Sequence, residues 1–242
     1  IIGTAVLSYR PLMVVGRLSL FVVVVGCHVS CQSRGGSSPV KGRRCGGGLV
    51  VTEMVASAAV LQQMRSEMRK LQTAAVEEAP LSVQLAGWDP QTMAEAARLC
   101  EGLGATFIDI NMGCPAKKVT GKLSGSALMR DPHLAAAIMH SVKSAVSVPV
   151  TLKMRLGWDE NSLNAAEFGR IAEDTGLSML AVHGRTRCQM YQGAADWKQI
   201  ASVVDAVSIP VIANGDIRCP DTALEAVSAS GAAGVMVGRG AQ

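Results

Sequence analysis

The sequence predicts an α/β barrel of eight parallel strands, and two observations support this fold class. First, seven short apolar segments alternate with segments of helical periodicity from about residue 47 onward. Apolar strands separated by helices are typical of a parallel sheet that is covered by helices. Second, each apolar segment ends in a polar residue, namely Glu53, Gln84, Asn111, Lys153, His183, Asn214 and Arg239. A barrel places such residues along one edge, whereas a doubly wound sheet, the alternative fold, would gather them at one switch point.

The expected strands cover residues 49–54, 81–87, 106–110, 148–155, 179–185, 209–216 and 234–239. The expected helices cover residues 56–73, 89–103, 131–146, 164–175, 195–207 and 220–230. Apolar residues three or four positions apart predict the first of these helices. Asp89-Pro90 and Asp131-Pro132 each combine an N-cap residue with a proline in the first turn. Gly176 is a typical residue at a helix C-terminus.

The first 46 residues differ from the rest and contain a low-complexity stretch around Gln32–Pro39. We therefore divide the chain into an atypical segment, residues 1–46, and a barrel domain, residues 47–242. The missing first strand of the barrel is expected at Leu20–Val25, and residues 32–41 are expected to be mobile. The sequence also stops just after the eighth strand. The barrel is accordingly expected to be incomplete at both ends, with an atypical first strand and no last helix.

Composition restricts the classes of function. The net charge of +4 permits a nucleic-acid partner without requiring one. The apolar run at Leu18–Val25 is too short to predict a membrane span. The seven cysteines include no Cys-x-x-Cys pair and no zinc-like spacing, so no metal site is expected. Cysteines scattered singly are typical of a reducing compartment, which predicts a cytoplasmic protein.

The stretch from Asp109 to Pro115 is the strongest candidate for chemistry. Gly113 and Pro115 end a strand and place Cys114 on a sharp turn. A thiol in a loop at the carboxyl end of a strand lies where α/β proteins carry out reactions. The alternative is a buried, inert cysteine, the commonest state of a free thiol, and position alone does not separate the two. Lys117 and Lys118, close behind, could lower a thiol pKa or contact a polyanion.

Three further groups of residues suggest an anionic ligand. Lys153 ends a buried strand, where a cation needs either a structural ion-pair partner or an electron-rich ligand. His183-Gly-Arg185-Thr-Arg187 is suited to bind an anion at the mouth of a barrel. Asn214-Gly-Asp216 and Gly238-Arg-Gly240 end the last two strands, where barrels commonly bind phosphate through backbone N–H groups.

The string Asn-Met-Gly-Cys-Pro-Ala-Lys-Lys-Val at residues 111–119, followed by Gly-Ser-Ala-Leu-Met at 125–129, closely resembles the bacterial-type tRNA-dihydrouridine synthases. The resemblance covers about residues 46–242. It implies an oxidoreductase that reduces uridine in tRNA to 5,6-dihydrouridine, with FMN as cofactor and NADPH or NADH as reductant. The sequence departs from the family at the first strand, which lacks the Ala-Pro-Met-Ala-Gly motif, and it lacks the family's C-terminal helical domain.

The resemblance also implies roles for individual residues. Cys114 would be the proton donor of the reaction. The flavin would be bound by Gln84, Lys153, His183, Asn214, Gly215, Asp216, Gly238 and Arg239. The RNA would be bound by Asn111, Lys117, Lys118, Arg185 and Arg187. Two alternatives stay open: an FMN-dependent barrel oxidoreductase that acts on a free pyrimidine, similar to dihydroorotate dehydrogenase, and an inactive truncated gene product that binds no flavin.

Overall fold

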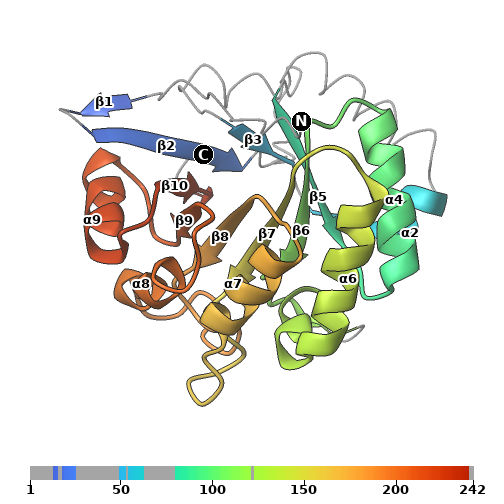
Figure 1. Ribbon diagram of the computed structural model, residues 1–242. Helices are drawn as coiled ribbons and strands as arrows, with labels where there is room; N and C mark the ends of the chain where they lie inside the picture. The colour runs from blue at the N-terminus through green and yellow to red at the C-terminus, as the bar shows by residue number, and fades with distance from the viewer. Residues whose placement is uncertain are drawn as a thin grey trace, which may run out of the picture.

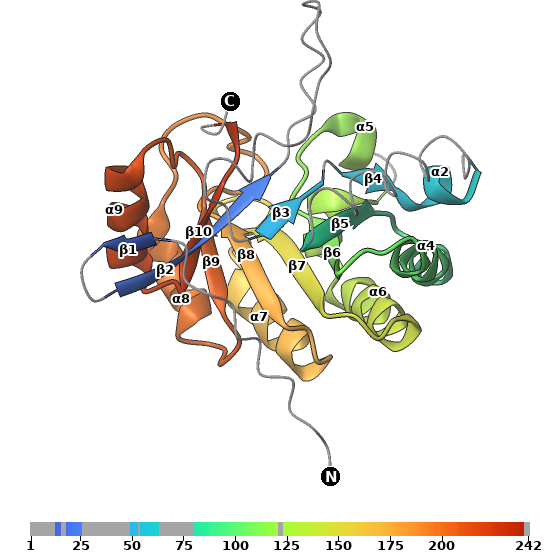
Figure 2. The same cartoon turned by 90° about the horizontal axis from the view of Figure 1, so that it is seen from above.

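The computed structural model describes residues 13–15, 18–25, 49–52, 54–62, 80–120 and 123–239. Within these residues eight parallel strands form a closed ring, because β2 pairs with both β3 and β10. In chain order these strands are β2 (Leu18–Val25), β3 (Leu49–Val51), β5 (Leu81–Ala86), β6 (Phe107–Met112), β7 (Val150–Arg155), β8 (Met179–His183), β9 (Val211–Asn214) and β10 (Gly234–Val237). Figure 2 shows the ring from above. The predicted barrel is confirmed.

The helices lie outside this ring (Figure 1). They are α2 (Ser57–Gln62), α4 (Pro90–Gly102), α6 (Pro132–Ala145), α7 (Ala165–Asp174), α8 (Trp197–Val204) and α9 (Pro220–Ser230). Both predicted N-caps are confirmed, since the side chain of Asp89 accepts from the backbone of Thr92 and that of Asp131 from Leu134. Gly176 follows α7 with a φ of 83°, as the sequence predicts for a helix end.

Side chains alternate between the two faces of each strand, so the barrel has an outer and an inner layer. Outward residues such as Ile110, Leu152 and Val182 are fully buried beneath the helices. The inner face holds a second, smaller apolar cluster of Leu49, Val51, Phe107, Ala181, Ile212 and Met236. Further along the same inner faces come Asn111, Lys153, His183 and Asn214. The barrel is therefore apolar in its lower interior and polar at the carboxyl ends of its strands.

The boundaries of several elements differ from those predicted. The strand expected at Leu20–Val25 is present as β2, so the atypical segment contributes a strand to the barrel. The strand expected over residues 49–54 is divided into β3 and a short β4 (Val55–Ala56), and β1 (Met13–Val15) pairs antiparallel with β2. Glu53, the helix predicted beyond Gln62 and the stretch 32–41 lie outside the described residues.

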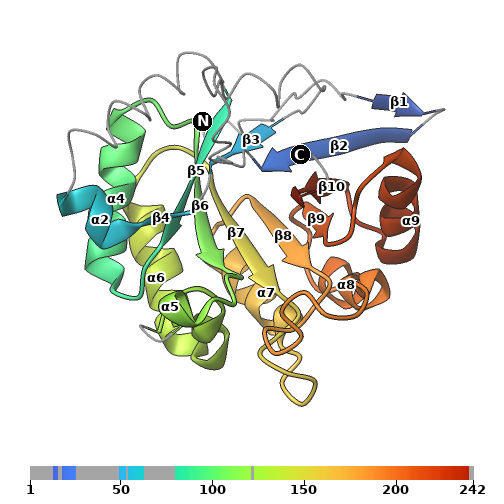
Figure 3. The same ribbon diagram turned by 180° about the vertical axis from the view of Figure 1, so that it is seen from behind.

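Two elements follow Cys114 that periodicity did not predict, because neither is longer than six residues. They are α5 (Lys117–Thr120) and the 3-10 helix η1 (Gly125–Arg130). Figure 3 shows α5 at the edge of the barrel to which the arrowheads of β6, β7 and β8 point. Within the described residues no helix has the length and apolar character needed to cross a bilayer.

At the opposite edge, two glutamates hold the loops that precede β7 and β9. Glu101, at the end of α4, accepts hydrogen bonds from the backbone of Ser147 and Val148 at 2.8 and 3.1 Å. Glu173, at the end of α7, accepts from the backbone of Ser208 and Ile209 at 2.8 and 3.2 Å. The two loops have nearly the same sequence, Val-Ser-Val-Pro-Val and Val-Ser-Ile-Pro-Val. Devices at this amino-terminal edge serve stability rather than chemistry.

Candidate active site

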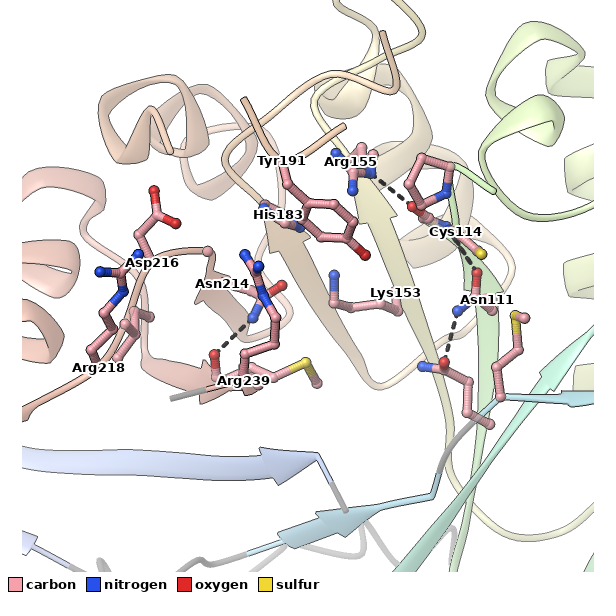
Figure 4. A pocket seen from close by; sticks show the side chains of 18 residues that line it. Asn111, Cys114, Lys153, Arg155, His183, Tyr191, Asn214, Asp216, Arg218 and Arg239 are labelled. Atoms are coloured by element: carbon pink, nitrogen blue, oxygen red, sulfur yellow. Dashed lines mark hydrogen bonds between the residues drawn. The ribbon is translucent and has the colours of Figure 1, made fainter. Parts of the chain in front are cut away.

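A cavity of about 580 Å³ opens at the carboxyl ends of the strands (Figure 4). It brings together every residue that the sequence assigned to catalysis or to the flavin. Those residues are Gln84, Cys114, Lys153, His183, Asn214, Gly215, Asp216, Gly238 and Arg239. Asn111 lines the same cavity, as do Arg155, Tyr191 and Arg218, which the sequence analysis did not select.

The loop that bears Cys114 is held from both sides. The side-chain oxygen of Asn111 accepts hydrogen bonds from the backbone N–H groups of Gly113 and Cys114 at 3.1 and 2.9 Å. The carbonyl oxygen of Cys114 accepts from both the backbone and the hydroxyl of Ser126 in η1. Gly125 has a φ of 61°, and a Cβ there would lie 2.8 Å from that carbonyl. These contacts fix a half-buried free thiol at the cavity wall.

Arg155 connects this loop to the one that follows β8. Its Nε donates to the carbonyl oxygen of Gly113, and its Nη1 donates to the carbonyl oxygens of Thr186 and Met190, all within 2.9 Å. The side chain is 1% exposed, and burial lowers the pKa of Arg155 only to about 10. It therefore stays charged at neutral pH. Arg155 lies two residues after Lys153 on the same strand face, which is the signal that could have identified it.

Lys153 and His183 form the centre of the cavity floor, and the amine of Lys153 points into the open space (Figure 4). Burial, reinforced by the charge of Arg155, lowers the pKa of Lys153 to about 7, although the carboxylate of Asp109 opposes this. Burial and the neighbouring cations, Lys153 foremost, lower the pKa of His183 to about 2. His183 is consequently neutral at physiological pH and is available for hydrogen bonding rather than as a proton donor in its charged form.

The other end of the cavity suits a phosphate group. Gly215 and Asp216 have φ angles of 108° and 55°, and such left-handed turns direct backbone N–H groups toward a common point. Among the described residues, no heavy atom lies within 4 Å of the position that a Cβ on Gly238 would take. Arg218 and Arg239 are exposed cations at this end. The carboxylate of Asp216 is already paired with Arg185 at 2.6 Å, so it does not repel an anion strongly.

Tyr191 lines the cavity and is 54% exposed. Its ring is contacted by the guanidinium carbons of Arg239 at 4.6 Å and of Arg155 at 5.7 Å. The ring thus joins the end that bears Arg239 to the wall that bears Cys114. A single tyrosine in a loop has no periodic signal, and the same is true of Arg218, so sequence reasoning could not select either residue.

The residues predicted to bind RNA are dispersed. Arg185 does not fit that prediction, because it is 2% exposed and its guanidinium is bonded to Asp216, to the carbonyl oxygens of Gln192 and Gly193, and to the ring of His183. Arg187 is half-buried and stacks on Trp158 at 4.7 Å. Lys117 is exposed on α5, and the side chain of Lys118 lies outside what the structure describes.

The sequence profile of the dihydrouridine synthase (Dus) family matches residues 41–242. The chain belongs to this family. It is 58% identical over 199 residues to a probable tRNA-dihydrouridine synthase of Rhodobacter capsulatus, and 51% identical over 200 residues to tRNA-dihydrouridine synthase B of Pseudomonas syringae pv. tomato. The matches cover 82% and 83% of this chain but only 61% and 59% of those relatives. The predicted family is confirmed, and the chain spans about three fifths of the length of these relatives.

The fold has counterparts among proteins of distant sequence. The N-acetylmannosamine-6-phosphate 2-epimerase of Clostridium perfringens aligns with a TM-score of 0.56 at 15% identity, over 92% of this chain and 87% of the epimerase. Such low identity supports the architecture alone. Within the described residues no group of three or more histidine, cysteine or carboxylate side chains could hold a metal ion.

Proposed function

We propose that this member of the dihydrouridine synthase family reduces uridine to 5,6-dihydrouridine in tRNA, with FMN as cofactor and NADPH or NADH as reductant. One observation carries the proposal: Cys114 lines the same cavity as Lys153, His183 and the two strand-end turns that carry Gly215 and Gly238. A proton donor and a site for a phosphorylated ring are therefore adjacent. The family match and the names of the relatives support the choice of substrate.

The residues present fit FMN. Its dianionic phosphate matches the end of the cavity with Gly215, Gly238 and the exposed cations Arg218 and Arg239. Its ring system matches the amide of Gln84, the amine of Lys153 and the neutral imidazole of His183. Lys153, with a pKa near 7, would be held in its charged form by an electron-rich ring beside it.

When bound and reduced, FMN supplies the hydride that carbon 6 of the uracil ring receives. Carbon 5 must then take a proton, and Cys114 is the group that donates it as a general acid. Asn111, Gly125 and Ser126 hold the loop of Cys114 in one conformation, so the thiol is positioned before substrate enters. Tyr191 lines the cavity, and its ring would limit the access of water to the reacting atoms once the cavity is filled.

The uridine must leave the tRNA fold to enter a cavity at the carboxyl ends of the barrel strands. Lys117, Lys118 and Arg187 are the cations that we assign to backbone phosphates, while Arg185 is assigned to the structure of the β8 loop. Asn111 is assigned to the base. Because the substrate is tRNA, we expect the protein to act in the cytoplasm.

The test is a reconstitution followed by a single turnover. The full chain is loaded with FMN, its flavin absorbance is recorded, and the reduced protein is mixed with unmodified tRNA or with free uridine and uracil. The proposal requires flavin binding and the gain of two hydrogens by a uridine within the tRNA. Reduction of the free pyrimidines alone would establish the barrel oxidoreductase that acts on a free pyrimidine. Absence of flavin binding would establish the inactive gene product.

A further inference from the structure

A continuous chain of hydrogen-bonded side chains runs across three strands beneath the cavity. The hydroxyl of Thr151 donates to Oδ1 of Asp109, and Nε2 of Gln84 donates to Oδ2 of Asp109, each at 2.5 Å. Nδ2 of Asn111 then donates to Oε1 of Gln84 at 2.7 Å. The chain ends where Oδ1 of Asn111 accepts from the backbone of the Cys114 loop. Gln84, Asp109 and Thr151 are direct neighbours in the strand register.

The orientation of both amides in this chain follows from its two ends. Backbone N–H groups can only donate, so Asn111 must turn its oxygen to the loop and its NH₂ group to Gln84. Gln84 must then present its oxygen to Asn111 and its NH₂ group to Asp109. An ionised carboxylate can only accept, so Asp109 requires the same orientation from the other end. The donors and acceptors therefore match along the whole chain.

This orientation determines what the cavity offers to a ligand. Each NH₂ group has a second hydrogen, and both Gln84 and Asn111 line the cavity. Asp109 is 2% exposed and does not line it. We propose that Asp109 is a positioning residue, which fixes both amides as donors toward a ring with carbonyl oxygens along its edge. That the ring is a flavin or a uracil rests on the proposed function, whereas the orientation of the amides does not.

The identity of residue 109 is informative because an asparagine could also bond to both Thr151 and Gln84, with its oxygen accepting from one and its NH₂ group donating to the other. A buried carboxylate is expensive, and burial raises the pKa of Asp109, against hydrogen bonds from Thr151 and Gln84 and the charge of Lys153. An asparagine would avoid that cost, but its own amide could turn and so permit both orientations of Gln84. The carboxylate leaves only one.

The test reverses the direction of the hydrogen bonds that Gln84 makes in this network. In Asn111→Asp the new carboxylate faces the oxygen of Gln84, and turning Gln84 would bring that oxygen against Asp109. Adding Asp109→Asn resolves the conflict, because the amide of residue 109 can donate to the turned Gln84 and still accept from Thr151. The double variant D109N/N111D therefore satisfies these hydrogen bonds at the same net charge, with only the two bonds made by Gln84 reversed in direction. It offers the cavity acceptors where the parent offers donors.

Three quantities are measured on the full chain: the thermal midpoint, the rate at which iodoacetamide alkylates Cys114, followed on its peptide by mass spectrometry, and FMN affinity. Asn111→Asp should lower the midpoint and raise the alkylation rate, on the order of tenfold for the loss of one well-made buried hydrogen bond. The double variant should return both quantities close to the parent values. Its FMN affinity should stay at least about tenfold weaker, because carboxylate and carbonyl oxygens repel.

Every outcome decides the inference. A double variant that is no more stable than Asn111→Asp, or effects of the two substitutions that simply add, would overturn the role of Asp109. If Asn111→Asp does not fold, a double variant that does fold supports the positioning role of Asp109. A double variant that also fails to fold overturns that role. A double variant that binds FMN like the parent would overturn the assignment of donors to the ligand. If the parent itself binds no FMN, the proposed function fails, while stability and alkylation still test Asp109.

Discussion

Arg155 of β7 donates a hydrogen bond of 2.8 Å to the carbonyl oxygen of Gly113, the residue before Cys114. The same guanidinium bonds to the carbonyl oxygens of Thr186 and Met190 in the loop after β8. Three acceptors around one planar group require the fixed geometry of arginine, which lysine does not reproduce. A single side chain thus sets the position of the loop that bears Cys114 relative to the loop that carries Tyr191.

The variant Arg155→Lys should therefore be destabilised. A lysine cannot satisfy all three carbonyl groups, and each buried group left unpaired costs about 1–3 kcal/mol. We expect the free energy of unfolding in urea to fall by at least about 2 kcal/mol. Arg130→Lys is the matched control, because Arg130 is exposed and contacts only the ring of Trp158 among the interactions described. Its effect should stay within ~0.5 kcal/mol, and equal effects of the two variants would contradict this account.

Cys114→Ala should abolish most of the uridine reduction while FMN and tRNA remain bound. Proton donation by a positioned general acid contributes typically ~100- to ~10,000-fold to a rate, so the loss should be of this size. The rate is measured in a single turnover with pre-reduced protein, and reduction of the flavin by NADPH serves as the control because it does not use this proton. A variant rate within a few-fold of the parent would remove Cys114 from the mechanism.

Two glycines at the phosphate end should respond differently to alanine. Gly238 lies outside the left-handed range and has no described heavy atom within 4 Å of its Cβ position, so Gly238→Ala should leave the thermal midpoint unchanged. If phosphate lies in that space, FMN affinity should fall at least about tenfold, the equivalent of about 1.4 kcal/mol. In Gly215→Ala the Cβ would approach His183 to 2.8 Å at a φ of 108°. That variant should lose stability without any ligand, and unchanged FMN affinity in Gly238→Ala would place the phosphate elsewhere.

The paired glutamates at the opposite edge should confer stability that depends on pH. Hydrogen bonds from Ser147 lower the pKa of Glu101, and those from Ser208 lower the pKa of Glu173. A carboxyl with a lowered pKa in the folded state stabilises above its ordinary value of 4.5, and that stability is lost as the pH falls through the lowered value. Replacing both glutamates by glutamine should therefore lower the free energy of unfolding at pH 7. This loss of stability should become smaller once the pH falls below 4.5, the ordinary pKa of a glutamate.

Urea unfolding of parent and double variant at pH 7 and at pH 3–4 measures this difference. Glu160→Gln is the control, because Glu160 is exposed in the loop after β7, and its deficit should be small at both pH values. A deficit that is the same at both pH values would mean that the hydrogen bonds do not depend on the charge of the two glutamates.

Much of the fold could be predicted because local rules and tertiary structure agree. The apolar strands, the caps at Asp89 and Asp131 and the glycine after α7 all follow from short-range patterns. The gathering of Lys153, His183 and Asn214 in one cavity followed from topology, since parallel strands in a barrel end at the same edge.

The remainder depends on contacts between distant segments, which a single sequence does not encode locally. Arg185 was expected to bind RNA, yet its side chain is buried and paired with Asp216, 31 residues later. Tyr191 acquires its position from arginines on β7 and after β10. The sequence places Asp109 in a strand but does not indicate the partners of its carboxylate. Only the structure shows that this carboxylate accepts hydrogen bonds from Gln84 and Thr151.

The pairing of β2 with β10 has a consequence for how the chain folds. It joins residue 22 to residue 235, so the ring cannot close before the segment around residue 235 has left the ribosome. Until then β2, on the side that β10 later covers, and the newest strand are open edges, and open edges of parallel strands recruit other chains. Contacts of such long sequence separation also make folding slow. Synthesis of this protein should therefore depend on chaperones more than its final stability would suggest.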